Sequence, residues 1–314
     1  MKIIRNIPAY KFSHGCVMSI GNFDGIHLGH QSIVERVIKK SQTRSIPSVI
    51  TTFEPHPHEF FTPDSADRIM GLREKYIALK EFSVDYLFLM RFDHSLANTT
   101  ADEFIKTFLL NGLKVKSLII GDDFRFGKKR QGDYELLKKY ADVKNFELEN
   151  TNTLEIGNKR ISSTRVRHLL QNHEFDKAEE LLGRPYFISG RVRHGDKRGR
   201  QLGFPTLNIG LKNNRTLFTG VFAVEIQGLG GIKKAVANIG YRPTVEGNIP
   251  QLEAHVFDFD QQCYGKQINV LFRKKLRDEK RFESIELLAQ QIDIDVHQAR
   301  EFFNLQVSHL KNTL

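Results

Sequence analysis

The stretch GNFDGIHLGH, residues 21–30, brings three glycines, an aspartate and two histidines together within ten positions. An apolar run at 16–20 precedes it, and a segment with helical spacing at 31–40 follows it. The stretch is therefore expected to lie where a strand turns into a helix. Such a junction favours anions, because the first N–H groups of a helix are unpaired and carry a partial positive charge.

The residue types in this stretch suit a phosphate ligand. Gly21, Gly25 and Gly29 allow the backbone to approach a ligand closely. His27 and His30 add two imidazole donors, which could hold phosphate oxygens and stabilise charge that develops at phosphorus. Metal binding is a weaker alternative, because no third ligand lies nearby in the sequence. The purely structural alternative is a glycine-rich turn with a capping aspartate.

The first half of the chain alternates between strand-like and helical patterns. Apolar runs lie at 17–20, 48–53, 86–90, 117–120 and, more weakly, 146–148. Helical patterns lie at 31–41, 72–82, 101–111 and 134–140. This alternation predicts βαβ units and a Rossmann-like α/β domain with a parallel sheet. Such sheets bind ligands beyond the carboxyl ends of their strands, which is where residues 21–30 would lie.

The pattern changes near residue 184, where we place a boundary between domains 1–183 and 184–314. Short strand-like runs then follow at 187–192, 220–226, 234–237, 253–257 and 268–272, separated by Gly, Asn and Pro turns. They predict a small antiparallel barrel or sandwich. Apolar residues at spacings of three and four over 284–303 predict a closing C-terminal helix.

The composition is that of an ordinary globular protein of 314 residues, with 40% hydrophobic and 27% charged residues. No apolar run approaches the roughly 18 residues of a membrane helix, and the two isolated cysteines fit a reducing cytoplasm. The formal net charge of +10 is compatible with nucleic acid or with a polyphosphate substrate. The densest basic stretch, RVRHGDKRGR at 191–200, is punctuated by glycine and is expected to be a loop.

The stretch at 21–30 resembles the HxGH signature of the nucleotidylyltransferase superfamily, in the form found in bacterial bifunctional riboflavin kinase/FAD synthetases. Three later segments resemble the same family in the same order: TFEPHP (52–57), GDDFRFGKKRQGD (121–133) and ISSTRVRHLL (161–170). The resemblance implies adenylyl transfer, in which an FMN phosphate attacks the α-phosphorus of ATP and pyrophosphate leaves. No covalent enzyme intermediate is needed, so catalysis would rest on positioning and electrostatic stabilisation.

The resemblance also implies roles for particular residues. ATP phosphate contacts fall to Gly21, Asn22, Phe23, Asp24, Gly25, His27, Gly29, His30, Ser162, Ser163, Thr164 and Arg165. Asp123 is expected to face the adenosine or ribose, and His56 and Pro57 the flavin. Two structural alternatives stay open: Ser162 could simply cap a helix, and FEPHP at 53–57 could be a loop held rigid by proline.

A second constellation, GDKRGRQLGFPTLNI, occupies 195–209. Its glycines could cradle phosphates through the backbone: Gly195, Gly199 and Gly203. Thr206 and Asn208 offer oxygen to a hard cation such as Mg²⁺. The segment is not a P-loop, because Asp196 stands where the lysine should be, and a Rossmann GxGxxG is absent from the sequence.

This second segment resembles the flavokinase motif that ends in PTAN, with Leu207 in place of the alanine. The resemblance continues through NIGYRPTVEG (238–247) and LEAHVFDF (252–259). It places Glu253 at the position of a catalytic base, which would take the proton of the riboflavin 5′-hydroxyl. Arg242 and Thr244 would line the flavin pocket.

The resemblance covers nearly the whole chain and implies a cytoplasmic bifunctional transferase. It would convert riboflavin to FMN and FMN to FAD, using ATP and Mg²⁺, without a nucleic-acid or membrane partner. The sequence leaves the oligomeric state open, a monomer included. Two alternatives remain: an enzyme with one of the two activities, and a basic nucleic-acid-binding protein built on a nucleotide-binding fold, which salt-sensitive binding would reveal.

Overall fold

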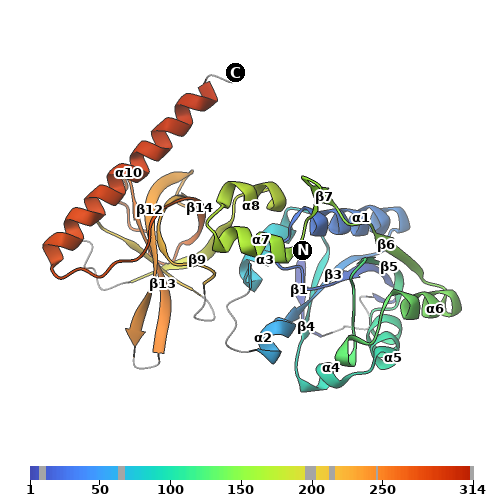
Figure 1. Ribbon diagram of the computed structural model, residues 1–314. Helices are drawn as coiled ribbons and strands as arrows, with labels where there is room; N and C mark the ends of the chain where they lie inside the picture. Colours follow the sequence, from blue (N-terminus) through green and yellow to red (C-terminus); the bar gives the residue numbers. More distant parts are fainter. Residues whose placement is uncertain (7–11, 63–67, 195–202, 212–215, 245–246, 312–314) are drawn as a thin grey trace. The chain divides into compact units, whose positions relative to one another are not determined.

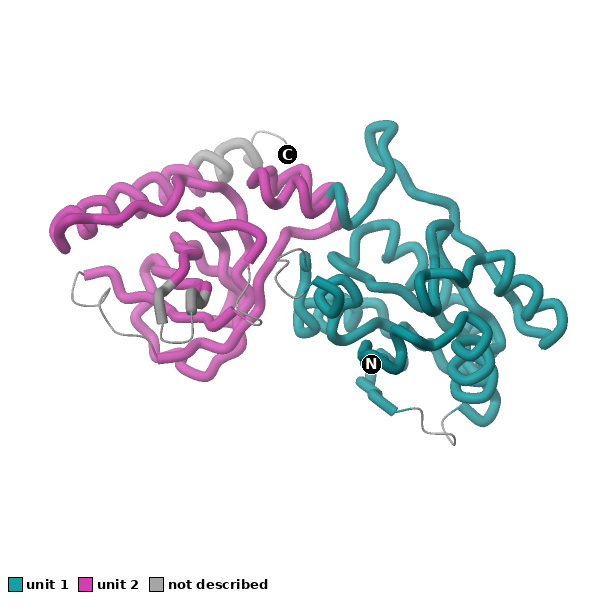
Figure 2. Tube along the Cα trace, turned by 60° about the horizontal axis from the view of Figure 1, so that its bottom comes forward, with its two compact units in different colours: residues 1–165 teal, residues 166–314 magenta. Residues whose placement is uncertain are grey.

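The computed structural model describes residues 1–6, 12–62, 68–194, 203–211, 216–244 and 247–311. The chain divides into two compact units, residues 1–165 and 166–314 (Figure 2). The expected boundary near residue 184 concerns the functional domains, and it stays a prediction.

The first unit is built on a six-stranded parallel sheet (Figure 1). Its order is β1-β4-β3-β2-β5-β6, and the strands are β1 (Lys2–Ile4), β2 (Cys16–Ile20), β3 (Ser48–Glu54), β4 (Tyr86–Arg91), β5 (Val115–Gly121) and β6 (Glu147–Thr151). The predicted Rossmann-like α/β domain is confirmed. The edge strand β1 was not predicted, because three residues give too short a pattern.

Helices connect these strands, as parallel pairing requires. They are α1 (Leu28–Arg44), α2 (Pro57–Phe61), α3 (Leu72–Lys80), α4 (His94–Asn98), α5 (Ala101–Phe104), the π-helix η2 (Ile105–Gly112), the 3₁₀ turn η3 (Lys128–Arg130) and α6 (Tyr134–Lys144). The predicted helix at 101–111 is thus a short α-helix that continues as a π-helix. A small hairpin, β7 (Glu155–Ile156) and β8 (Lys159–Arg160), precedes α7 (Ser163–Gln171).

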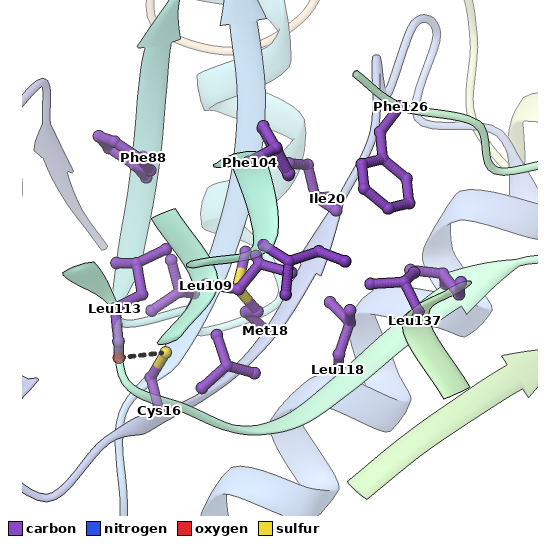
Figure 3. Close-up of a cluster of buried hydrophobic side chains, with 14 of the residues drawn as sticks. Cys16, Met18, Ile20, Phe88, Phe104, Leu109, Leu113, Leu118, Phe126 and Leu137 are labelled. Carbon is purple, nitrogen blue, oxygen red and sulfur yellow. Dashed lines mark hydrogen bonds between the residues drawn. The ribbon is translucent and has the colours of Figure 1, made fainter. Parts of the chain in front are cut away.

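The sheet and its helices enclose an apolar cluster (Figure 3). Met18 and Leu118 of the central strands β2 and β5 are fully buried there, together with Leu109 of η2. The thiol of Cys16 donates a hydrogen bond to the Leu113 carbonyl oxygen at 3.4 Å. Burial raises the pKa of this thiol. Cys16 is therefore a core residue rather than a reactive one.

The order of winding reverses at β2. The chain first adds β3 and β4 on one side of β2, and then places β5 and β6 on the other. The carboxyl ends of β2 and β5 therefore flank a topological switch point, where open α/β sheets bind ligands. Residues 21–27 follow β2 and residues 122–123 follow β5, so both segments lie at this point.

The second unit holds a closed six-stranded barrel in the order β10-β13-β12-β11-β14-β9 (Figure 1). Its strands are β9 (Phe187–Arg193), β10 (Leu207–Gly210), β11 (Gly220–Gln227), β12 (Lys233–Thr244), β13 (Gly247–Val256) and β14 (Gln267–Arg277). All pairs are antiparallel. The predicted barrel is confirmed, and β10, which begins within the PTLN segment at Leu207, is an additional strand.

The C-terminal helix α10 (Ile285–Lys311) lies against the outside of the barrel. Ala299 and Phe303 of α10 pack on Val221 and Ala223 of β11 and on Val236 of β12. This outer face is therefore buried by a helix, and residues that share it lie under or beside α10.

Helix α8 (Phe175–Leu182) packs on the barrel as well. The ring of Phe175 lies 5.3 Å from that of Phe218 and 5.8 Å from those of Phe222 and Phe272. Glu179 forms an ion pair with Arg273 at 2.8 Å. The barrel therefore includes a helix that precedes residue 184 in the chain.

A fragment that begins at residue 184 is expected to be markedly less stable than one that begins at 166. The shorter fragment lacks Phe175 and exposes Phe222 and Phe272, which are 0% and 1% exposed in the whole chain. Losing one buried phenylalanine side chain alone costs about 3–5 kcal/mol. Thermal unfolding of both fragments measures the difference. Equal melting temperatures would show that α8 contributes nothing to the barrel.

Candidate active sites

The loop between β2 and α1 has an unusual backbone. Phe23 and Ile26 both have φ of +46°, in the left-handed region, and Gly25 has φ of +86°. The side chains of Phe23 and Ile26 are buried, which anchors the loop on both sides of Gly25. Residues other than glycine hold such φ values where the surroundings fix them, often at functional sites.

His27 is the N-cap of α1. Its Nδ1 accepts a hydrogen bond from the backbone N–H of His30 at 3.3 Å, so the neutral ring carries its proton on Nε2. The capping residue is thus a histidine, and the alternative of a capping aspartate is wrong. Burial lowers the pKa of His27 to about 4. At neutral pH the ring is therefore an uncharged N–H donor.

The spacing HxGH has a packing reason. The rings of His27 and His30 stack with centroids 3.7 Å apart and planes 16° from parallel. A Cβ at Gly29 would lie 3.2 Å from Cε1 and Nδ1 of His27, tighter than ordinary contact. Glycine at this position therefore lets the His27 ring fold back over the first turn of the helix.

Asp24 uses its carboxylate within the protein. It accepts hydrogen bonds from the backbone N–H groups of Ile69, at 3.0 and 3.1 Å, and Met70, at 3.1 Å. Its carbonyl oxygen accepts a hydrogen bond from Ser163 Oγ at 2.9 Å. Asp24 therefore ties the loop to two distant segments, and a carboxylate is a poor direct partner for phosphate because the charges repel.

Residues 162–165 open helix α7. Ser162 Oγ accepts a hydrogen bond from the backbone N–H of Arg165 at 3.2 Å, which is the capping role left open above. The Arg165 guanidinium donates to the carbonyl oxygens of Ile156 and Lys159 at 3.1 and 2.9 Å, which holds the β7–β8 hairpin. Thr164 is exposed.

Asp123, just beyond β5, is 72% exposed and pairs with Arg160 at 2.8 Å. Arg160 also pairs with Asp122 at 3.1 Å. The charges of Asp123 and Arg160 both act on the imidazole of His27, Asp123 raising its pKa and Arg160 lowering it. The predicted nucleotide residues 27 and 123 therefore belong to one electrostatic environment at the switch point.

His56 is the N-cap of α2, with Pro57 in the first helical position. Its Nδ1 accepts a hydrogen bond from the His58 backbone N–H at 3.2 Å. Burial lowers the pKa of His56 to about 4, and the charge of Asp24 opposes this shift. The segment with His56 therefore faces the same charges as the loop at 21–27.

Sequence reasoning missed Lys75, a fully buried lysine beneath this loop. It is 1% exposed, and burial lowers its pKa to about 8. The sequence did carry a signal, because Lys75 shares the buried stripe of α3 with Ala78 and Leu79 at spacings of three and four. A lysine within the buried apolar stripe of a helix is therefore a candidate functional residue.

In the barrel, antiparallel pairing brings the predicted kinase residues together. Asn208 on β10 pairs with Glu253 on β13, and Glu253 pairs with Asn238 on β12. The row continues to Val221 on β11, which packs under α10. Directly opposite side chains share a face, so Asn208 and Glu253 lie on the outer face that α10 borders.

A cavity of about 360 Å³ lies on this face. Its walls come from the barrel, from α10 and from the segment between β14 and α10: Phe204, Thr206, Val221, Val236, Ala237, Asn238, Glu253, His255, Arg277, Glu279, Lys280, Phe282, Leu288, Ile292 and Asp295. The size and the mixture of apolar walls with a few polar groups are typical of small-molecule sites. Thr206 and Glu253 thus line one pocket.

An ion pair fixes α10 beside the pocket. The Arg277 guanidinium donates to both carboxylate oxygens of Asp295, at 2.7 and 2.8 Å. Gln291 also donates to Asp295 at 3.0 Å. Asp295 is 3% exposed, so this is a buried bidentate pair, a geometry that holds two elements in a defined position.

The oxygens near Glu253 fit a hard cation. A hydroxyl from Thr206 and an amide oxygen from Asn208 are among the oxygen donors that Mg²⁺ accepts. The Asn208 oxygen accepts a hydrogen bond from Gln251 at 2.7 Å, which orients it and leaves a second lone pair.

Some predicted residues have no described side chain. Gly195 and Gly199 lie outside the described residues, and Gly203 has φ of +85°. Arg242 and Thr244 belong to strand β12, but their side chains are not described. Their roles stay predictions.

Among the described helices, none is long and apolar enough to span a bilayer.

Comparison with known proteins matches both units. The family model described as FAD synthetase matches residues 9–165, and that described as riboflavin kinase matches 182–303. A bifunctional riboflavin kinase/FMN adenylyltransferase of Escherichia coli (strain K12) is 46% identical over 309 residues, covering 97% of this chain and 99% of that protein. Its Haemophilus influenzae counterpart is 42% identical over 307 residues, covering 97% and 100%.

Among solved structures, one described as a macrolide-efflux protein from Streptococcus pneumoniae superposes with a TM-score of 0.77. It is 30% identical and covers 94% of this chain and 97% of its own.

A nucleotide-binding sheet joined to a barrel with a carboxylate-lined pocket defines a two-domain transferase that uses ATP. The chain belongs to the bifunctional riboflavin kinase/FMN adenylyltransferase family.

Proposed function

We propose that this chain makes FAD from riboflavin in two steps, each at its own site. The barrel phosphorylates riboflavin to FMN, and the N-terminal sheet adenylates FMN to FAD. The observation that carries the proposal is the presence of both sites in one chain: stacked histidines at the switch point, and Glu253 beside Asn208 on the barrel.

In the adenylylation step, a phosphate oxygen of FMN attacks the α-phosphorus of ATP. The bond from that phosphorus to the bridging oxygen breaks, and pyrophosphate leaves. His27 donates its Nε2–H to a phosphate oxygen, and His30 lies against it in the same turn. Bound phosphate raises the pKa of His27 from its low value, because a nearby negative charge favours the charged ring. The contact therefore strengthens as charge develops.

In the kinase step, Glu253 accepts the proton of the riboflavin 5′-hydroxyl as its oxygen bonds to the γ-phosphorus of ATP. ADP leaves with the bridging oxygen. Thr206 and Asn208 would hold Mg²⁺, which would supply positive charge against the phosphates. The apolar walls contributed by Leu288, Ile292 and Phe282 receive the flavin.

The proposal extends to the setting of the enzyme. Riboflavin, FMN and ATP are the partners, and the basic surface serves polyphosphate substrates rather than nucleic acid. The enzyme acts in the cytoplasm. The functional domains are residues 1–183 and 184–314. Helix α8 lies at the end of the first domain in the sequence and packs on the barrel of the second.

The test is direct turnover. Purified protein is incubated with riboflavin, ATP and Mg²⁺, and the flavins are resolved by chromatography. We expect FMN to appear first and FAD to follow, with neither formed when Mg²⁺ is chelated. FMN alone, or FAD only from added FMN, would favour an enzyme with one activity. Salt-sensitive binding of DNA or RNA without flavin turnover would favour the nucleic-acid alternative.

A further inference from the structure

Lys75 lies beneath the loop that carries the histidines. Its ammonium donates hydrogen bonds to the backbone carbonyl oxygen of Asn22 at 2.6 Å and to Thr52 Oγ1 at 2.9 Å. Thr52 Oγ1 in turn donates to the same Asn22 carbonyl oxygen at 3.0 Å. One carbonyl is thus held from two sides, immediately before Phe23, where the backbone enters the left-handed region.

We propose that Lys75 is a positioning residue of the adenylylation site, which holds the Asn22 carbonyl so that residues 21–27 present His27 to the phosphates. The inference rests on the proposed function. Lys75 does not touch substrate, because it is 1% exposed and lies on the inner side of the loop. It acts through the backbone of the loop.

The burial of a lysine needs a reason, because burying an ammonium costs free energy unless acceptors and charges compensate. Here the compensation comes from several elements. The charges of Asp24 on the same loop, Glu54 at the end of β3 and Glu59 on α2 favour the charged amine, whereas Arg68 opposes it. Arg68 is itself paired with Glu54 at 2.8 Å and Glu59 at 3.4 Å.

These charges connect the two predicted ligand segments of the first unit. Lys75 also lowers the pKa of His56, which lies in the segment expected to face the flavin. The Asp24 carboxylate, which favours the charged Lys75, anchors the loop to Ile69 and Met70, just before α3. A substitution of Lys75 is therefore expected to affect the loop at 21–27 and the segment at 54–59 together.

A positioning role and a stabilising role give opposite pH trends. The pKa of Lys75 is lowered to about 8 from 10.5 in the absence of burial. Between these values the unfolded chain binds the proton and the folded chain does not, so Lys75 makes the stability of the unit rise with pH. The positioning role weakens over the same range, because a neutral amine donates weaker hydrogen bonds.

The experiment compares Lys75→Met with the wild type in the full chain. Methionine keeps the length and removes both donors. We expect FAD formation from FMN to fall by about 10²-fold at pH 7, the scale of a displacement of about 1 Å. Riboflavin kinase activity, which lies in the other unit, should stay unchanged and report a folded barrel, and thermal unfolding of the variant should show that the first unit is folded as well. Lys80→Met, an exposed lysine on the same helix, is the matched control.

The pH profile separates positioning from packing, because a role in packing alone would leave the ratio of the two rates unchanged with pH. We expect the wild-type to variant ratio of adenylylation rates to fall about tenfold from pH 7 to pH 9, where about nine-tenths of an amine with a pKa near 8 is deprotonated. Rates limited by other groups cancel in this ratio. A second variant, Thr52→Val, removes one acceptor and should show a smaller loss with the pH trend retained.

Three outcomes would overturn the inference, and a fourth would overturn the proposed function. A Lys75→Met enzyme that makes FAD as fast as the wild type overturns the inference. So does a ratio that stays constant from pH 7 to pH 9, which would assign Lys75 to packing alone. Loss of the kinase activity in Lys75→Met, together with a full adenylylation rate in Thr52→Val, would also overturn it. A wild-type protein that makes no FAD would instead sink the proposed function.

Discussion

Replacing His27 and His30 by alanine is expected to abolish most FAD formation from FMN while leaving FMN formation from riboflavin intact. The His27 ring is buried and neutral, with its Nδ1 used by the His30 backbone N–H. Its Nε2–H is therefore aimed by the fold before any substrate arrives. Removing one such preorganised donor usually costs about 10²–10³-fold in turnover, so the double variant should lose at least that much.

Single variants separate the two histidines. His27→Ala should be the more damaging, because it also removes the N-cap of α1, which commonly stabilises a helix by about 1 kcal/mol. The cap contributes to stability and the Nε2–H to turnover. A thermal unfolding measurement beside the rate tells them apart. His14→Ala, an exposed histidine of the same unit, is the control. Adenylation within about twofold of wild type, set against the usual 10²-fold, would refute the assignment.

Glu253→Gln should produce the reverse pattern. The change keeps the shape of the side chain and removes its basicity, so the kinase rate should fall by about 10²–10⁴-fold, the usual contribution of a positioned base. FAD formation from added FMN should be nearly unaffected. Riboflavin binding, followed by quenching of flavin fluorescence, should persist, because the apolar walls of the pocket are unchanged.

The control for this variant is Glu301→Gln, an exposed glutamate on α10. Two results would contradict the role of Glu253. One is an unchanged kinase rate in Glu253→Gln. The other is a fall in both activities together with a lower melting temperature, which would mean that Glu253 supports the barrel rather than acting on the hydroxyl.

Local patterns in the sequence predicted most elements of both units, because buried strands and amphipathic helices leave short-range periodicity. They missed what depends on partners far along the chain. Strand β10 exists because Leu207–Gly210 pairs with residues 251–254. Similarly, α8 looked like the end of the first domain, and the contact of Phe175 with Phe272, almost a hundred residues later, places it on the barrel.

The same contrast between local patterns and distant partners holds for the candidate sites. The family resemblance named His27, but the sequence could not show that its Nδ1 caps the helix or that burial keeps it uncharged. The resemblance also placed Asp24 among the nucleotide contacts, and the sequence could not show that its carboxylate accepts a hydrogen bond from backbone 45 positions away. The pairing of Asn208 with Glu253 depends on the register of two strands, which periodicity does not specify.

That register limits where the gene can gain or lose codons. Glu253 pairs with Asn238, and the two arms of the β12–β13 hairpin continue in step to the pair Thr244 and Gly247. One residue inserted within either arm would turn the rest of that strand over and carry Glu253 away from the face of Asn208, unless a bulge absorbed it. Insertions between Thr244 and Gly247 leave the pairing intact. Length variation in this hairpin is therefore tolerated at its tip and selected against in its arms.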